Sequence, residues 1–560
     1  MKLCYLLDII FGITCLILAT GCVSGQVDQE ELTDRYHDFL IRQWPLQRES
    51  EFDANEPNAL GLVRPLGLST IKPLSTDPDY FKTEGPKTLR LSLTEAIQAV
   101  LINSPEVRVI SYDPALAEEE IRKQVAAFDP SFFGEAQYDK TDRIKSSSSD
   151  IGQADVYRFE SGLKSRSTYG SEWSASYALT NSWDDLIGRS PQRRYEPVMV
   201  FRLKQPLLRD GWQRVNLANV NISRMQHRVA MLAFKQKAED LATETIAAYW
   251  QLVQARRDRI VFKELLSAAQ QTLDKVQGRR KIDATDVQIT QAIVSVNSRK
   301  AFLVQAEKLV KDAQDTLVRL MADPAVDLID QTEIIPTDEP YETPKGLGVE
   351  AMIAVALQNN PIMRQVKMRV EIADINLEVA DNQKMPRLDL LASASSQSLN
   401  RHINKSHGKL NNYDYNSYGI GLTMEIPLGN RARKAALRSR KIERLKAVTV
   451  VQNVADQVAV QTKERLRRIQ SSYDQIGIQE DTIQAAAAHL LALEDSEKVR
   501  ERLTPEYLQV KLQAQEALAT AQRARMSAVV DYNVALAQLA QITGRVLQVH
   551  QVGLRKPELP

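Results

Sequence analysis

Apolar residues recur at helical spacing in two stretches of the chain. In residues 366–380 the apolar positions step by four, three, four and three residues, and residues 510–528 repeat this spacing with alanine at most positions. Such a stripe packs helices side by side in a coiled coil, and alanine lets the backbones approach closely. The pattern predicts paired helices, although either stripe alone would also suit an amphipathic helix on a globular core.

Two stretches predict very long helices. Residues 210–277 contain no proline, with Gly211 and Gly278 at the two ends, and residues 430–502 contain no proline and only one glycine, Gly477. A helix of about 65 residues reaches about 100 Å at 1.5 Å per residue. Helices gain most of their stability from packing, so these should pair along their length. Turns are expected at 277–286 and 499–507.

Six segments alternate apolar with polar residues, as strands do. They are residues 132–138, 157–164, 169–179, 198–203, 388–395 and 418–426. In the third, Trp173, Tyr177 and Leu179 are separated by small or polar residues, a period-2 pattern typical of membrane barrel strands. Residues 146–150 and 402–407 are predicted to be solvated loops.

The chain is built from two copies of one pattern. Residues 91–108 align without gaps on residues 347–364, an offset of 256 that persists to residues 130 and 386. Four landmark prolines match between the copies, Pro105 with Pro361 and Pro206 with Pro427, and the last pair has an offset of only 221. All 35 residues of the difference lie in the strand-rich segment of the first copy. Helices of fixed length and strands with variable loops are therefore expected. Asp113-Pro114 should interrupt a helix of the first copy alone.

Composition narrows the function classes. Lysine plus arginine total 72 and aspartate plus glutamate total 71, giving a formal charge of +1, which offers no field to recruit nucleic acid. The three cysteines all lie in the first 22 residues, so the body has no disulfide and no cysteine metal site. The apolar run ending at Cys22 suits a signal peptide. The small residues before Cys22 resemble a lipobox, which would make Cys22 a lipidation site; plain cleavage is the alternative.

These features predict the following organisation. Residues 1–22 are a signal peptide with a lipobox-like end, 23–88 an extended proline-containing segment, 89–325 the first repeat with strands at about 130–206, 326–345 a linker, 346–545 the second repeat with strands at about 386–427, and 546–560 a tail.

Several motifs together resemble a known family. Leu-x-Leu-x-Glu-Ala-Ile at 91–97, the two Asn-x-Pro breaks, Gln205-Pro206-Leu and the run from Gly421 to Pro427-Leu-Gly resemble TolC-like outer-membrane efflux proteins throughout residues 90–545. The resemblance implies a mainly α fold with a membrane β-barrel: long helical coiled-coil hairpins and strands contributed to one barrel of a homotrimer. A few strands alone leave two unpaired edges, which lipid does not tolerate, so closure needs neighbouring copies. The extra strand candidates in the first copy imply either an added hairpin or a larger barrel.

The resemblance also implies a role and partners. It describes a passive export duct in the outer membrane of a Gram-negative-type bacterium, in contact with outer membrane lipid, a periplasmic adaptor and an inner-membrane pump. The rival hypothesis is a periplasmic coiled-coil scaffold without a barrel.

Candidate site residues lie at the two helix turns, which in the family form the periplasmic mouth. Asp283, Asp286 and Glu506 would form rings of carboxylates in a trimer and favour cations. The alternative is that acids in a first helical turn only complement the helix dipole. The six histidines are scattered, and His402 and His407 lack a carboxylate partner. We therefore expect no catalytic, cofactor or metal site, and no enzyme.

Overall fold

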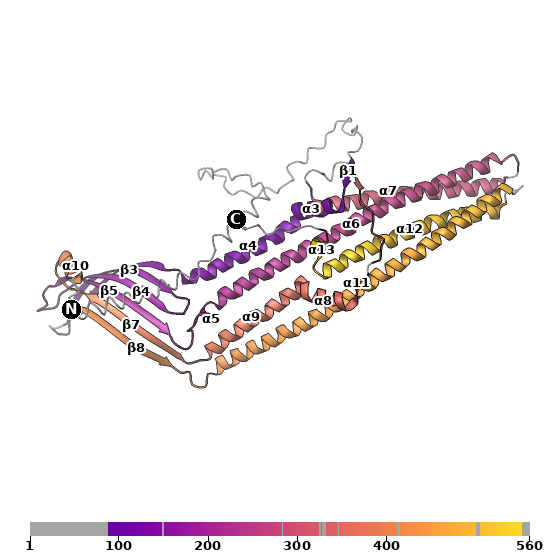
Figure 1. Ribbon diagram of the computed structural model, residues 1–560. Helices are drawn as coiled ribbons and strands as arrows, with labels where there is room; N and C mark the ends of the chain where they lie inside the picture. Colours follow the sequence, from indigo (N-terminus) through magenta and orange to yellow (C-terminus); the bar gives the residue numbers. More distant parts are fainter. Residues whose placement is uncertain are drawn as a thin grey trace, which may run out of the picture.

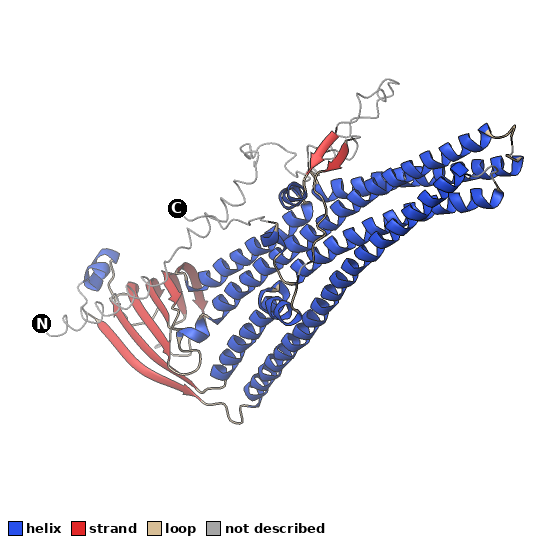
Figure 2. Cartoon of the chain, turned by 45° about the vertical axis from the view of Figure 1, so that its right-hand side comes forward, coloured by secondary structure: helices blue, strands red, loops and turns tan. Residues whose placement is uncertain are grey.

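The computed structural model describes residues 88–550, apart from 148–149, 283, 324–325, 327–331, 345, 412–414 and 500–503. The described chain is elongated, with a sheet at one end and long helices running away from it (Figures 1 and 2). The predicted signal peptide, Cys22, residues 23–87 of the predicted extended segment, and Asp283 lie outside the described residues.

Each repeat begins with two consecutive helices. They are α3 (Leu93–Asn103) and α4 (Pro105–Val125) in the first repeat, and α8 (Val349–Asn359) and α9 (Pro361–Gln383) in the second. Pro105 and Pro361 are the first residues of α4 and α9, where the missing N–H of proline costs no hydrogen bond. Ser92 caps α3 through a capping box with Glu95. The offset of 256 and the breaks at both prolines are therefore confirmed.

Pro114 does not interrupt its helix. α4 continues through it from Pro105 to Val125, so the expected break at Asp113-Pro114 is wrong. Proline removes one backbone hydrogen bond and strains the preceding turn. In this helix Pro114 is buried, and α4 packs along the long helix α6, so tertiary packing outweighs the local cost.

Four long helices form the body. They are α6 (Ala218–Gly278), α7 (Asp286–Met321), α11 (Arg431–Val499) and α12 (Pro505–Ile542). α6 packs along α7, α11 along α12, and α12 also contacts α6, which joins the repeats. The ends of α6 and α11, and those of α7 and α12, differ by the same 221 residues as the sequence repeat. At 1.5 Å per residue α6 and α11 extend about 90 and 100 Å.

The alanine stripe near the C-terminus is only half covered. Ala514, Ala521 and Ala528 are buried, whereas Val510 and Ala517 are exposed. Ala517 lines a groove of about 470 Å³ between α11 and α12. Half of the predicted seam thus faces away from the packed core of this chain.

A small parallel sheet fastens the middle of the bundle. β1 (Thr88–Leu91) pairs with β6 (Glu333–Pro336), which lies in the segment predicted as a linker. The hydroxyl of the buried Tyr249 lies 3.1 Å from the carbonyl oxygen of Leu91 and accepts from the backbone N–H of Thr337 at 3.1 Å. This core includes the short helix α13 (Val546–Val549), which follows the second repeat. The first strand, the linker and α6 are therefore tied together.

Six strands form one continuous antiparallel sheet. They are β2 (Ser131–Asp142), β3 (Gln153–Arg166), β4 (Glu172–Asp184), β5 (Arg193–Pro206), β7 (Arg387–Gln397) and β8 (Asn416–Glu425), hydrogen-bonded in that order. All six predicted strands are present. Pro206 ends β5, and Pro427 follows β8 in the same way. β2 and β5 correspond to β7 and β8, so the hairpin β3–β4 accounts for the extra length of the first repeat.

Short helices complete the described chain. They are the 3-10 helix η3 (Ala126–Phe128), α5 (Gln213–Asn216) and α10 (Ile403–Asn411). Among the helices of the described ranges, none combines the length and apolarity that a membrane span requires.

Candidate functional site

One face of the six-stranded sheet is apolar across every strand. Residues directly opposite each other on paired strands share a face, and the register places the following side chains together: Phe132 and Tyr138 of β2, Tyr157, Phe159 and Leu163 of β3, Trp173 and Leu179 of β4, Met199, Phe201 and Leu203 of β5, Leu388 and Leu390 of β7, and Tyr418, Ile420, Leu422 and Met424 of β8. We call this set the apolar face.

The apolar face is strongly exposed in the single chain. Ile420 is 84% exposed, and its neighbours Tyr418 and Leu422 are exposed as well. Soluble monomers rarely expose continuous apolar patches of this extent. The strands have 10 to 14 residues, enough for the about 9 to 11 residues that a tilted membrane strand needs. This face therefore has the chemistry and height of a lipid-facing band.

The opposite face of the sheet is polar and hollowed. It carries Glu135, Gln137, Arg158, Glu160, Lys164, Glu172, Ser174, Ser176, Arg202, Lys204, Asp389, Ser393, Ser395 and Thr423. Ion pairs cross this face, including Arg158 to Glu160 at 3.0 Å and Lys204 to Glu172 at 3.2 Å. A hollow of about 850 Å³, lined by residues such as Lys164, Arg202 and Ser393, opens over it. We call this the polar face; it can line a water-filled space.

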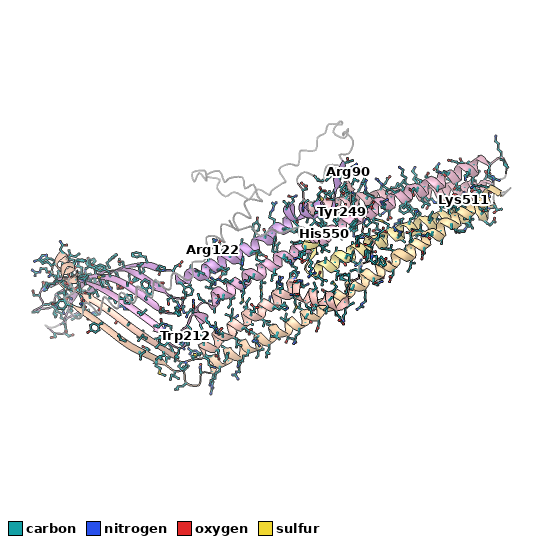
Figure 3. The ribbon with its side chains drawn as sticks, viewed as in Figure 1. Arg90, Arg122, Trp212, Tyr249, Lys511 and His550 are labelled. Carbon is teal, nitrogen blue, oxygen red and sulfur yellow. The ribbon has the colours of Figure 1, made fainter. Side chains whose placement is uncertain are left out.

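Aromatic residues mark both ends of the apolar face. Tyr138, Tyr157 and Tyr195 lie in one row of paired residues near the loops farthest from the helices, and the Tyr138 and Tyr157 rings stack with centroids 4.6 Å apart. Trp212, which is 67% exposed, lies at the other end, where the sheet meets α5 (Figure 3). Aromatic residues at the two edges of an apolar band are typical of membrane–water interfaces.

The predicted loop around His402 and His407 contains a helix. α10 occupies residues 403–411 and lies against β5, and the Nε2 of His407 lies 2.5 Å from the hydroxyl of Tyr177. His407 Nδ1 is 2.9 Å from the carbonyl oxygen of Ile403, one turn earlier. The expectation of a solvated loop is therefore wrong for this segment. Among the described residues no group of three or more histidine, cysteine, aspartate or glutamate residues could hold a metal ion.

The two helix turns meet at the far end of the bundle (Figure 1). Thr285 caps α7 and Thr504 caps α12, each through its side-chain oxygen. Asp286 is the first residue of α7, with its carboxylate 3.3 Å from Arg280, and Glu506 is the exposed second residue of α12. Asp286 and Glu506 thus lie at one end of the molecule, in first helical turns.

Buried charges lie just inside this end, and sequence reasoning did not find them. Lys511 is only 3% exposed and forms an ion pair with Glu497, which also lies 3.7 Å from Lys275. This cluster of Lys275, Glu497 and Lys511, which we call the distal ion cluster, joins α6, α11 and α12; Figure 3 labels Lys511 near the far end. Burial acts to raise the pKa of Glu497, but the hydrogen bond and charge of Lys511 and the charge of Lys275 outweigh it and lower that pKa.

A second buried tie joins α7 to α12. The guanidinium of Arg299 donates to Gln515 Oε1 and to the carbonyl oxygen of Leu512, both at 2.7 Å. Gln515 in turn donates to the hydroxyl of Thr272 on α6 at 3.3 Å. The only sequence signal for either tie is a charged residue beside the apolar stripe, and spacing alone does not distinguish that from a solvated position.

Comparisons with known proteins agree with this geometry. Residues 352–545 match the model of the family described as outer membrane efflux protein. No curated protein sequence matches the chain.

Solved outer membrane proteins share the fold over most of the chain. The CusC channel protein is 16% identical, with a TM-score of 0.59, and the match covers 82% of this chain and 93% of CusC. VceC of Vibrio cholerae is 16% identical with a TM-score of 0.57, covering 81% of this chain and 96% of VceC. The CmeC channel of Campylobacter jejuni is 13% identical with a TM-score of 0.57, covering 81% and 86%.

The family model covers most of the second repeat, and the fold match extends over both repeats. Proteins of this family are passive conduits rather than enzymes. The second repeat therefore belongs to the outer membrane efflux protein family, and the chain as a whole has the fold of TolC-like outer membrane channels.

Proposed function

We propose that this protein is an outer membrane export duct: a homotrimer whose sheets close one barrel and whose helices form a periplasmic tunnel. The observation that carries the proposal is the six-stranded sheet with an exposed apolar face, a polar opposite face and two outer edges, set at one end of helices about 90 to 100 Å long. In lipid every backbone polar group needs a partner, so an open sheet must close. Neighbouring copies supply the missing partners at β2 and β8.

The proposed duct is passive. An inner-membrane pump supplies the energy, and a periplasmic adaptor meets the far end of the helices. In the trimer, carboxylates of Asp283, Asp286 and Glu506 would ring this mouth and favour cations. Replacing Glu506 by Gln should lower the cation-to-anion permeability ratio in planar bilayers. An unchanged ratio would leave these acids the simpler role of complementing the helix dipole.

We further propose that residues 1–22 direct export and that Cys22 is acylated. Each buried methylene of an acyl chain contributes about 0.8 kcal/mol to anchoring, so several chains hold a protein firmly. Outer membrane attachment through Cys22 would add to the barrel rather than replace it.

Fractionation of the native protein tests the proposal. A crosslinked trimer that is extracted from the outer membrane only by detergent is the expected result, with labelled lipid incorporated by the wild type and lost in Cys22→Ser. A soluble monomer or dimer would overturn the duct and favour the rival, a periplasmic scaffold. A detergent-dependent trimer without lipid label would reject acylation alone.

A further inference from the structure

The extra hairpin of the first repeat is an integral part of the sheet. β3 pairs along its full length with β2, from Ser131 opposite Lys164 to Asp142 opposite Gln153. β4 pairs in the same manner with β5, from Glu172 opposite Lys204 to Trp183 opposite Arg193. The hairpin is therefore inserted between the two strands that the first repeat shares with the second, and it separates β2 from β5.

The hairpin also carries the same two faces as the strands around it. Tyr157, Phe159 and Leu179 continue the apolar face, whereas Arg158, Glu160 and Ser174 continue the polar face. A hairpin projecting into solvent as a flap would have no need for this alternation. The pattern fits strands with lipid on one side and water on the other.

The turn of the hairpin nearest the helices is held in place by the body of the protein. Arg166 donates to Asn216 Oδ1 at 2.8 Å, and this contact links the end of β3 to α5. Gly170 in the turn has a φ of +86°, and a Cβ there would lie 2.4 Å from the carbonyl oxygen of Asp210. The turn thus sits tightly against the connection that leads to α6, and the hairpin is fixed at its base.

The strand count suits closure with further copies of this chain. The six strands alternate in direction, so the outer strands β2 and β8 run antiparallel to each other. β8 of one copy can therefore pair with β2 of the next in the same antiparallel manner as the strands within the sheet. An inserted hairpin adds two strands and preserves this relation.

From these observations we infer that the barrel of the trimer has eighteen strands, six from each copy, in place of the twelve that two strands per repeat would give. The inference rests on the proposed trimeric duct. With a strand spacing of about 4.8 Å and a tilt of about 40°, eighteen strands close at a diameter of about 36 Å, against about 24 Å for twelve. The cross-section is then about twice as large, and the hairpin of the first repeat admits bulkier polar cargo through the membrane section.

Cysteine scanning tests the position of the hairpin, because the body of the chain has no cysteine. Ser174 and Ala175 are neighbours on β4 that face the polar and the apolar side, respectively; Ser393 and Ala394 are the matched pair on β7. Each is changed singly to cysteine in the full-length protein, reconstituted in lipid vesicles and treated with a charged, membrane-impermeant maleimide.

We expect Ser174→Cys and Ser393→Cys to react and Ala175→Cys and Ala394→Cys to be protected. If both hairpin variants react while the β7 pair still alternates, the hairpin lies outside the barrel and the inference is wrong, although the duct stands. If the β7 pair does not alternate either, the proposed duct itself is wrong. Electron microscopy of the wild-type trimer gives an independent measure: a barrel of about 36 Å supports eighteen strands, and one of about 24 Å overturns the inference.

Discussion

Removing the charge of Lys511 should weaken the far end of the bundle more than any surface ion pair does. The Lys511 side chain is almost fully buried, and Glu497 is 16% exposed, so Lys511→Met leaves a largely buried carboxylate. Breaking a buried pair by removing one partner costs about 3 to 5 kcal/mol. Lys275 remains 3.7 Å from Glu497 and the carboxylate keeps some contact with water, so we expect a loss near the lower value, about 3 kcal/mol.

Thermal unfolding of the detergent-solubilised protein, followed by circular dichroism, measures this loss. The matched control is Lys498→Met: Lys498 pairs with Asp495 at 2.9 Å on the same helix, with side chains 76% and 62% exposed. An exposed pair of this kind contributes less than about 1 kcal/mol. Equal destabilisation by the two variants would refute the importance of burial, and additive effects of Lys511→Met and Glu497→Gln would refute the coupling.

The same cluster gives a pH dependence with a definite sign. The folded-state pKa of Glu497 is lowered below its ordinary value of 4.5, so its contribution to stability is present above that value and is lost as the pH falls through the lower folded-state pKa. The difference in melting temperature between the wild type and Lys511→Met should therefore shrink in acid. A constant difference down to the acid limit would contradict the assignment.

Three further variants test the middle of the bundle. Burial raises the pKa of Glu239 to about 7 from an ordinary 4.5, so stability should fall by about 3 kcal/mol as the pH rises from 4.5 to about 7; Glu239→Gln should flatten this profile, and an unchanged profile would reject it. Tyr249→Phe removes the acceptor of the Asp338 backbone N–H and should cost about 1 to 3 kcal/mol by thermal unfolding, whereas a neutral effect would mean that water replaces the hydroxyl. Gly544 has a φ of +66°, and a Cβ there would lie 2.6 Å from the carbonyl oxygen of Asn359, so Gly544→Ala should cost more than about 1 kcal/mol; an unaltered melting temperature would disprove the strain.

The sequence predicted the long-range order of this fold because that order depends on counting. Proline at the start of α4 and α9 marks both breaks, and a constant offset of 221 residues relates the ends of the long helices. Strand alternation located all six strands, since each has one apolar and one polar face. These signals repeat along the chain, so a chance match at one place has little weight.

Features that depend on contacts between distant segments were not predictable. Pro114 stays helical because α4 packs on α6, and His407 is drawn into a helix that touches Tyr177 on another strand. Lys511 and Arg299 are buried by helices of the other repeat or hairpin. A charged residue in a helical stripe looks the same in sequence whether water or a partner helix covers it.

The single change of offset shows which part of the architecture can vary. A helix that packs along two others cannot gain residues without shifting every contact beyond the insertion, and α6 packs along α7, α4 and α12. An antiparallel sheet, by contrast, accepts a whole hairpin: the chain leaves and returns at the same end, and the direction of every other strand is preserved. The β3–β4 hairpin uses this freedom, since it enters between β2 and β5 while the helices on both sides keep their repeat lengths. Barrel width can therefore change in this fold without altering the length or register of the helical body.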